Sequence, residues 1–133
     1  MPSRSDIKPS HIAKLLPGIS LIDVAEDLPQ SRVRLAGTKL REIHDREITG
    51  ETIEGLDWGD KRDYWLAAYR RTVEQVEPTQ GVLKGPRFSK EHMVQHWLRL
   101  PLASHDGGEV AMILGHDYFV PAIHNPLRER RIA

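Results

Sequence analysis

The sequence predicts an α+β domain that has a five-stranded antiparallel sheet, helices on one face of the sheet and a short helix at the N-terminus. Five segments have the alternation or apolar content of strands: residues 19–25, 32–36, 82–83, 93–103 and 110–119. The main helical patterns all lie between the second and third strands, which groups those helices on one face. Consecutive strands joined by short turns pair antiparallel.

The N-terminal region predicts a short amphipathic helix before the first strand. Ser10 is a suitable N-cap, Ile12 and Leu15 provide an apolar side, and Pro17-Gly18 ends the helix. Residues 26–30 form a turn between the first two strands, because Asp and Pro are turn-forming residues.

Three helical segments follow the second strand. Thr38 is an N-cap for a helix that runs to about residue 44, and residues 51–56 predict one further helical turn. Asp60 begins the longest helix, which ends near residue 76 before a proline. One apolar stripe runs along this helix and consists of Trp65, Tyr69, Thr72 and Val76.

The last two strands form a hairpin through the turn Asp106-Gly107-Gly108, where the aspartate is expected to serve the turn and not a cation. Alternation divides residues 93–103 into two faces. We expect the inner face to carry Val94, His96, Leu98, Leu100 and Leu102, together with Val33, Leu35, Val110, Met112 and Leu114 of other strands. The opposite face then carries Met93, Gln95, Trp97 and Arg99.

Composition excludes several classes of protein. The chain has 133 residues, 19 basic and 19 acidic, so nothing in its net charge favours nucleic acid or an anionic membrane as a partner. It has no cysteine, which excludes disulfides, thiol catalysis and thiolate metal sites. No secretory signal and no apolar run of about 20 residues is present. We therefore expect a cytoplasmic domain with no nucleic-acid or membrane partner.

Several motifs occur in a specific order. The segment 32–38 reads Arg-Val-Arg-Leu-Ala-Gly-Thr, Thr49-Gly50 follows, and Leu100-Pro101-Leu102 precedes the Asp-Gly turn. With the opening 5–9 and Leu15-Leu16-Pro17, these motifs resemble a PAS domain, specifically a group of short stand-alone PAS-like proteins found mainly in alphaproteobacteria. The sequence departs from the usual pattern at Ile43-His44-Asp45, where a glycine often follows an apolar residue.

The resemblance implies a single PAS-like domain over residues 1–120, followed by a C-terminal tail over residues 121–133. It also implies a cleft between the helices and the inner face of the sheet, and frequent dimerisation through the outer face or the N-terminal helix. Without a cysteine, a photoreactive flavin adduct is excluded. The identity of any cofactor is unknown at this stage.

Candidate site residues follow from these faces. The residues expected to contact a ligand in the cleft are Trp65, Tyr69, His96, Leu98 and Met112. The residues expected at an interface are Met93 and Trp97, as an exposed apolar patch, with Ile12 and Leu15 of the N-terminal helix. His92 and His96 have a metal-site spacing for a helix, but about 13 Å separates them on a strand, so no metal site is predicted.

Three functions remain open. The first is a non-enzymatic PAS-like sensory domain that binds a small molecule or a partner protein and signals by docking or by forming a homodimer. The second is a small enzyme on a cone-shaped α+β fold similar to the ketosteroid isomerases, with Asp23 and His96 as its acid–base pair. The third is a purely structural dimerisation module with a filled core.

Overall fold

The computed structural model describes residues 1–8, 10, 13–56, 58–86 and 90–122, and it contains one five-stranded sheet. The strands are β1 (Ile19–Asp23), β2 (Arg32–Ala36), β3 (Thr79–Lys84), β4 (Met93–Ala103) and β5 (Val110–Pro121). Their order across the sheet is β2-β1-β5-β4-β3, and every neighbouring pair is antiparallel. The predicted α+β architecture with a five-stranded antiparallel sheet is confirmed.

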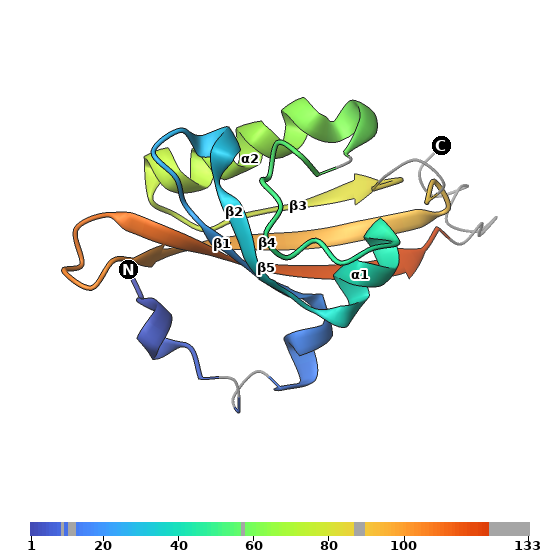
Figure 1. Ribbon diagram of the computed structural model, residues 1–133. Coiled ribbons are helices and arrows are strands. Elements are labelled where there is room, and N and C mark those ends of the chain that lie inside the picture. Colours follow the sequence, from blue (N-terminus) through green and yellow to red (C-terminus); the bar gives the residue numbers. More distant parts are fainter. Residues whose placement is uncertain (9, 11–12, 57, 87–89, 123–133) are drawn as a thin grey trace, which may run out of the picture.

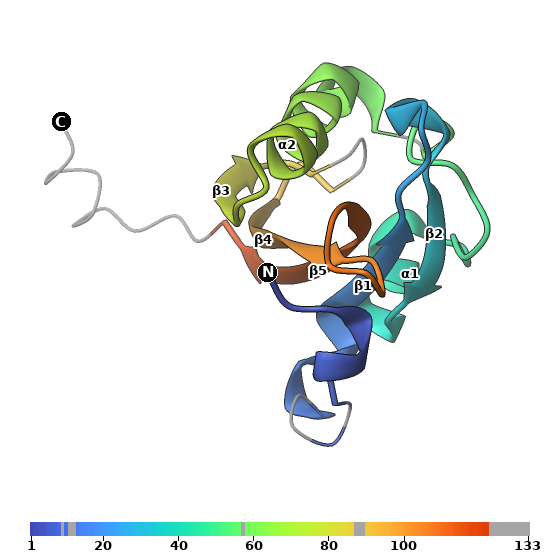
Figure 2. The same ribbon diagram turned by 90° about the vertical axis from the view of Figure 1, so that its left-hand side faces the viewer.

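Helices cover one face of this sheet (Figures 1 and 2). The two α-helices are α1 (Thr38–His44) and α2 (Arg62–Gln75), and short 3-10 helices occur at Arg4–Asp6, Ala13–Gly18, Leu28–Gln30 and Gly59–Lys61. Figure 2 shows α2 above the strands and the N-terminal segment on the opposite side of the sheet. We call the face toward α2 the inner face and the face toward the N-terminal segment the outer face.

Most predicted elements are present, with several differences. The predicted N-terminal helix is the 3-10 helix Ala13–Gly18, which contains Pro17 and Gly18 instead of ending at them. Residues 51–56 form a bridge and turns instead of a helical turn. The third strand is β3 and is longer than the predicted 82–83, because Gly81 does not break it. The helical stripe ends early, because Val76 has a left-handed backbone (φ 51°) and is 48% exposed.

The two faces of β4 are the reverse of the prediction. Gln95, Trp97 and Arg99 are buried on the inner face, whereas His96 is exposed on the outer face. Aliphatic residues were assigned to the inside because they avoid water, but a second core lies on the outer face. That core consists of Ile19, Leu21, Leu102 and Leu114, with Ile7, Leu100 and Met112 packed against it.

The N-terminal segment covers this second core. The Ala103 N–H donates to the carbonyl of Pro2 at 2.7 Å, and Ser3 forms a parallel bridge to Ala103. Ile7 packs against the outer cluster. The aliphatic residues of the outer face are therefore buried by a segment outside the sheet. For this reason, the apolar character of a strand residue does not show that it faces the helices.

A bulge in β2 separates two residues that were expected to share a face. Leu21 pairs with Leu35, but the next residue, Ile22, pairs with Val33, so one residue of β2 is extra. Val33 is buried in the main core, whereas Leu35 points to the outer face and is 45% exposed. The expectation that Leu35 lines the inner side is wrong for this reason.

The β4–β5 turn follows its predicted chemistry. The Gly108 N–H donates to Asp106 Oδ1 at 3.1 Å, and the Ser104 hydroxyl donates to the same oxygen. Both hydrogen bonds lower the pKa of Asp106, and the bond from Ser104 has the larger effect. Gly107 has φ 77°, a conformation that glycine adopts without strain. None of the helices in the described part of the chain has the length and apolar character that a membrane span requires.

Candidate functional site

A cleft lies on the inner face between the sheet, α1 and the loop that follows α1. The cavity within it is small, about 20 Å³. The apolar wall includes Ile22, Val33, Ile43, Leu56, Trp58 and Phe119. The polar part of the lining includes Tyr69, Gln95, Arg99 and Asp117. The cleft therefore has room for about one water molecule.

A buried ion pair lies at the polar end of the cleft. Arg99 Nη2 donates to Asp117 Oδ1 at 3.0 Å, and the side chains of Arg99 and Asp117 are 3% and 0% exposed. The other guanidinium nitrogens also have partners: Nε donates to the Tyr69 hydroxyl at 3.2 Å, and Nη1 donates to the carbonyls of Leu98 and His116. These bonds offset the cost of removing the Arg99 guanidinium from water.

Arg99 stays charged in this environment. Burial by itself lowers the pKa of Arg99, but the Asp117 carboxylate and the Tyr69 oxygen more than offset this effect, so the pKa of Arg99 is raised above its ordinary value. The guanidinium carbon also lies 4.9 Å from the ring centroid of Trp65, 5.5 Å from that of Tyr69 and 5.8 Å from that of Trp97. Aromatic rings at these distances stabilise a cation further.

Gln95 extends the polar cluster, in which two acceptor atoms have no partner. Its Nε2 donates to Asp117 Oδ1 at 2.6 Å, so that oxygen receives both Gln95 and Arg99. Gln95 Oε1 and Asp117 Oδ2 are buried and have no hydrogen-bond partner among the described residues. An unpaired buried acceptor costs about 1–3 kcal/mol. The cleft thus contains two acceptors that a bound donor would satisfy.

Two glycines give the large inner side chains their space. A Cβ at Gly115 would lie 2.5 Å from Ser20 Oγ and 3.1 Å from the Arg99 guanidinium, and Gly115 faces Arg99 across the ladder. A Cβ at Gly81 would lie 2.7 Å from the ring of Trp97, which it faces. The close approach of Trp97 accounts for a glycine at position 81.

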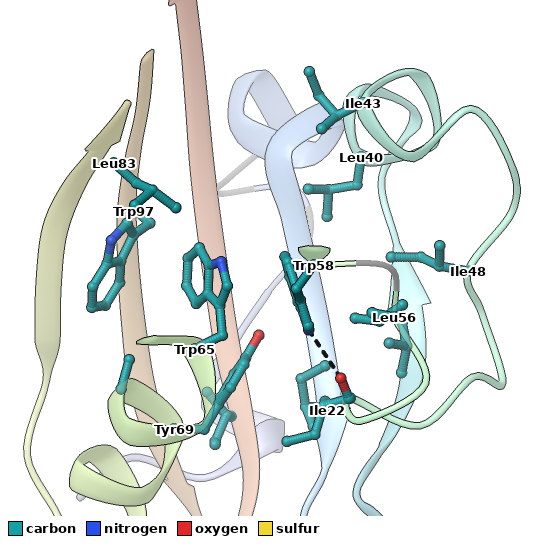
Figure 3. Packing of buried hydrophobic residues seen from close by; sticks show 14 of the residues in the cluster. Ile22, Leu40, Ile43, Ile48, Leu56, Trp58, Trp65, Tyr69, Leu83 and Trp97 are labelled. Atoms are coloured by element: carbon teal, nitrogen blue, oxygen red, sulfur yellow. Dashed lines mark hydrogen bonds between the residues drawn. The ribbon is translucent and has the colours of Figure 1, made fainter. Parts of the chain in front are cut away.

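Aromatic rings pack together beside the cleft (Figure 3). Trp58 and Trp65 stack with their centroids 5.0 Å apart, and Trp97 lies 5.2 Å from Trp65. Trp58 Nε1 donates to the carbonyl of Ile53 at 2.9 Å, the bond drawn in Figure 3, and this bond fixes the loop before α2. His44 at the end of α1 lies edge-on to Trp58 at 5.4 Å. These contacts tie the loop and both helices to one core.

The structure brings only part of the predicted ligand set to the cleft. Tyr69 lines the cleft, and Trp65 is fully buried beside it in the aromatic cluster. Their contact with a ligand stays a prediction. His96, Leu98 and Met112 lie on the outer face, so the prediction that they point into the cleft is wrong. On both β4 and β5, the residues that were predicted to face the helices face the other way, which explains the position of His96, Leu98 and Met112.

The predicted interface residues are also dispersed. Trp97 is 4% exposed and belongs to the main core, and Met93 packs against the same core, so they do not form an exposed patch. Leu15 is 46% exposed, and its interface role stays a prediction. Ile12 lies outside the described residues.

The proposed acid–base pair of the enzyme hypothesis does not form. Asp23 is in register with Met112, whereas His96 is in register with Tyr118, six positions further along β5. That separation is about 20 Å along a strand. Asp23 instead pairs with Arg34 at 2.8 Å at the exposed end of the sheet. In the part of the chain that the structure describes, no three His, Asp or Glu side chains are grouped to hold a metal ion.

Sequence reasoning missed Gln95, Arg99 and Asp117 as site residues. Gln95 and Arg99 alternate with His96 and Leu98, so they fall on the face opposite the predicted inner one. One signal was available: Trp97 lies between them on the same face, and an exposed tryptophan between two exposed polar residues is unusual. Choosing the tryptophan as the inner residue would have placed both polar neighbours in the cleft.

Comparison with known proteins agrees with this fold. The sequence matches the PAS domain family over residues 1–116, and the chain therefore belongs to that family. No curated protein matches it in sequence. Among solved structures, it is similar to the LOV protein of Rhodobacter sphaeroides, with 18% identity, a TM-score of 0.59, and coverage of 96% of this chain and 75% of that one.

Two further structures are similar. A PAS domain from Colwellia psychrerythraea has 10% identity and a TM-score of 0.61, and the match covers 86% of this chain and 98% of that one. A sensory box sensor histidine kinase from Vibrio cholerae has 18% identity and a TM-score of 0.56, with coverage of 88% and 90%. At these identities the likeness concerns the fold alone.

Proposed function

We propose that the protein is a non-enzymatic sensory domain that binds a small molecule in the inner cleft and signals through the outer face of its sheet, by association with a second copy of itself. One observation carries the proposal: β4 and β5 place the polar cluster of the cleft on one face and an uncovered apolar patch on the other. Asp117 points inward between His116 and Tyr118, which point outward. A change at the cleft therefore acts directly on the strands of the patch.

The outer patch consists of Val82, His96, Leu98, His116 and Tyr118. The N-terminal segment packs over the other end of the outer face and leaves Val82 61% and Tyr118 59% exposed. Exposed apolar patches of this kind commonly mark interaction sites.

A second copy fits this patch because the patch is uncharged. The residues that line the surface groove here include no Asp, Glu, Lys or Arg. A two-fold interface places the same patch on both sides, so a net charge on the patch would face an equal net charge on the partner. An uncharged surface with both apolar and hydrogen-bonding side chains avoids that repulsion.

Sedimentation velocity of Tyr118→Asp tests this proposal. We expect the unmodified protein to form dimers as its concentration rises, and we expect Tyr118→Asp to weaken dimerisation by about tenfold or more, because it buries one carboxylate from each copy without a partner. The matched control is Val76→Asp, at a residue at the end of α2 that is 48% exposed, against 59% for Tyr118.

Two results would contradict the proposal. One is an unmodified protein that stays monomeric up to millimolar concentration. The other is equal weakening by Val76→Asp and Tyr118→Asp, which would place the interface elsewhere. Urea unfolding of both variants checks that any change in sedimentation arises from association and not from loss of the fold.

The narrow cleft supports a second candidate, a structural dimerisation module that binds no ligand. Its core would be filled by its own side chains, consistent with space for about one water molecule. The two candidates share the dimer and differ in the cleft, so a ligand-binding measurement separates them.

A further inference from the structure

We propose that the outer-face dimer dissociates at acid pH, because each copy brings two histidines, His96 and His116, to the interface. Protonation of both histidines on both copies places four positive charges against one another. This inference rests on the dimer proposed above and names its regulation. It is carried by the positions of the two side chains and by the charged groups on the elements around them.

The two histidines are close neighbours on the outer face. His96 on β4 is exposed and in register with Tyr118 on β5, whereas His116 on β5 is half-buried and in register with Leu98 on β4. They are therefore diagonal neighbours on adjacent strands, about 7–8 Å apart. Both line the same surface groove, together with Val82, Leu98 and Tyr118. An interface centred on this patch includes both histidines.

The charged groups around the groove do not neutralise a protonated histidine. The adjoining elements are β1, β3, β4, β5 and the 3-10 helix Ala13–Gly18, where a Cβ at Gly18 would lie 3.3 Å from His116 Nε2. The other charged or basic residues on these elements or directly before them are Lys14, Asp23, Lys84, His92, Arg99 and Asp117. The two lysines have the same sign as a protonated histidine.

Both carboxylates among these residues have other partners. Asp117 points to the inner face and pairs with Arg99. Asp23 pairs with Arg34, and it lies about 13 Å along β1 from the residue opposite His116. Tyr118 adds a phenol, a type of group that ionises only in alkaline solution. A charge on either histidine would therefore enter the interface without a counter-ion.

The sign of the pH effect follows from this arrangement. A charge that is buried without a partner is costly, so the dimer favours the uncharged imidazole. The dimer then binds fewer protons than two separate copies, and association weakens as the pH falls. A histidine ordinarily titrates at about pH 6.5, and one that must lose its proton weakens association by about tenfold at one pH unit below its titration point.

Sedimentation velocity of the full chain at about pH 7.5 and about pH 5.5 tests the inference across the range in which histidine titrates. A chelator in both buffers removes metal ions that could bridge histidines. We expect the dissociation constant of the dimer to be at least about tenfold higher at the lower pH. Urea unfolding at both pH values checks that the change arises from association and not from loss of the fold.

A double variant assigns the effect to the two histidines. His96→Gln combined with His116→Gln keeps polar side chains but removes both titrating groups, and we expect its dissociation constant to change by less than about threefold between the two pH values. The matched control is His105→Gln, at an exposed residue in the β4–β5 turn, which should keep the full pH response. If the double variant does not dimerise, the single variants decide, because each should show a smaller pH effect than the unmodified protein.

Two outcomes would overturn the inference. One is a dimer of the unmodified protein that is equally tight at both pH values. The other is a pH effect that stays unchanged in the histidine variants, which would assign it to another group. Either result leaves the outer-face dimer standing, whereas a protein that is monomeric at both pH values would contradict the dimer itself and this inference with it.

Discussion

Replacing Arg99 with methionine is expected to lower the free energy of unfolding by about 3–5 kcal/mol, because it leaves the buried Asp117 carboxylate without a counter-ion. Asp117 would keep only Gln95 as a side-chain donor among the contacts described. The three aromatic rings around the guanidinium would lose their cation as well. Urea denaturation followed by tryptophan fluorescence measures the change.

The matched control for this prediction is Arg34→Met. Arg34 pairs with Asp23 at 2.8 Å, but these side chains are 62% and 41% exposed. An exposed pair of this kind contributes about 0–1 kcal/mol. Similar losses in the two variants would show that burial does not make the Arg99–Asp117 pair special, and the description of the polar cluster would then be wrong.

Replacing Trp97 with alanine is expected to cost about 3–5 kcal/mol, as for other large aromatic residues removed from a core. Trp97 is 4% exposed, packs on Trp65 at a centroid distance of 5.2 Å and donates from Nε1 to the Tyr64 hydroxyl at 2.8 Å. The variant also leaves a cavity beside Gly81, where no side chain can fill it. Thermal or urea unfolding measures the loss.

His96→Ala is the control for Trp97→Ala, since the two residues are neighbours on opposite faces of β4. His96 is exposed and contacts Tyr118 through its ring at 6.3 Å. Surface substitutions of this kind change stability by about 0.5 kcal/mol or less. A large loss for His96→Ala and a small loss for Trp97→Ala would contradict the observed faces of β4, in which Trp97 is buried and His96 is exposed.

Apart from residues 51–56, the sequence was sufficient to predict the order of the strands and the main helices. The strand β2 and the helix α1 were predicted within one residue, and β4 was predicted with its observed bounds. Turn residues, prolines and helix caps act locally, so a single sequence carries them. The motifs around Gly37-Thr38 and Leu100-Pro101-Leu102 also pointed correctly to the PAS family.

The inner face of the sheet could not be predicted by the same reasoning. Both faces of β4 are buried in part, one by α2 and the aromatic cluster and the other by the N-terminal segment through Ile7. Alternation gives the two faces but not which one turns toward the helices. The rule that apolar residues lie inside then selected Leu98 over Trp97 and assigned the wrong face.

The candidate site was missed for a related physical reason. Arg99 and Asp117 are buried as a pair that bond to one another, and Asp117 also accepts from Gln95. The Arg99–Asp117 bond joins two strands across 18 residues of sequence. A single polar residue on a strand gives no sign of such a partner. Tyr69 was found because an aromatic helical stripe is a local pattern, whereas the cluster it contacts depends on tertiary structure.

Thiol labelling of two single-cysteine variants, Gln95→Cys and His96→Cys, tests the face assignment of β4 most directly. The natural chain has no cysteine, so each variant carries one reporter thiol. At a concentration where the protein is monomeric, the thiol at position 96 should react with a chromogenic disulfide reagent nearly as fast as an unfolded control. The thiol at position 95 should react only as fast as the domain opens. Rapid reaction at position 95 with protection at position 96 would contradict the account.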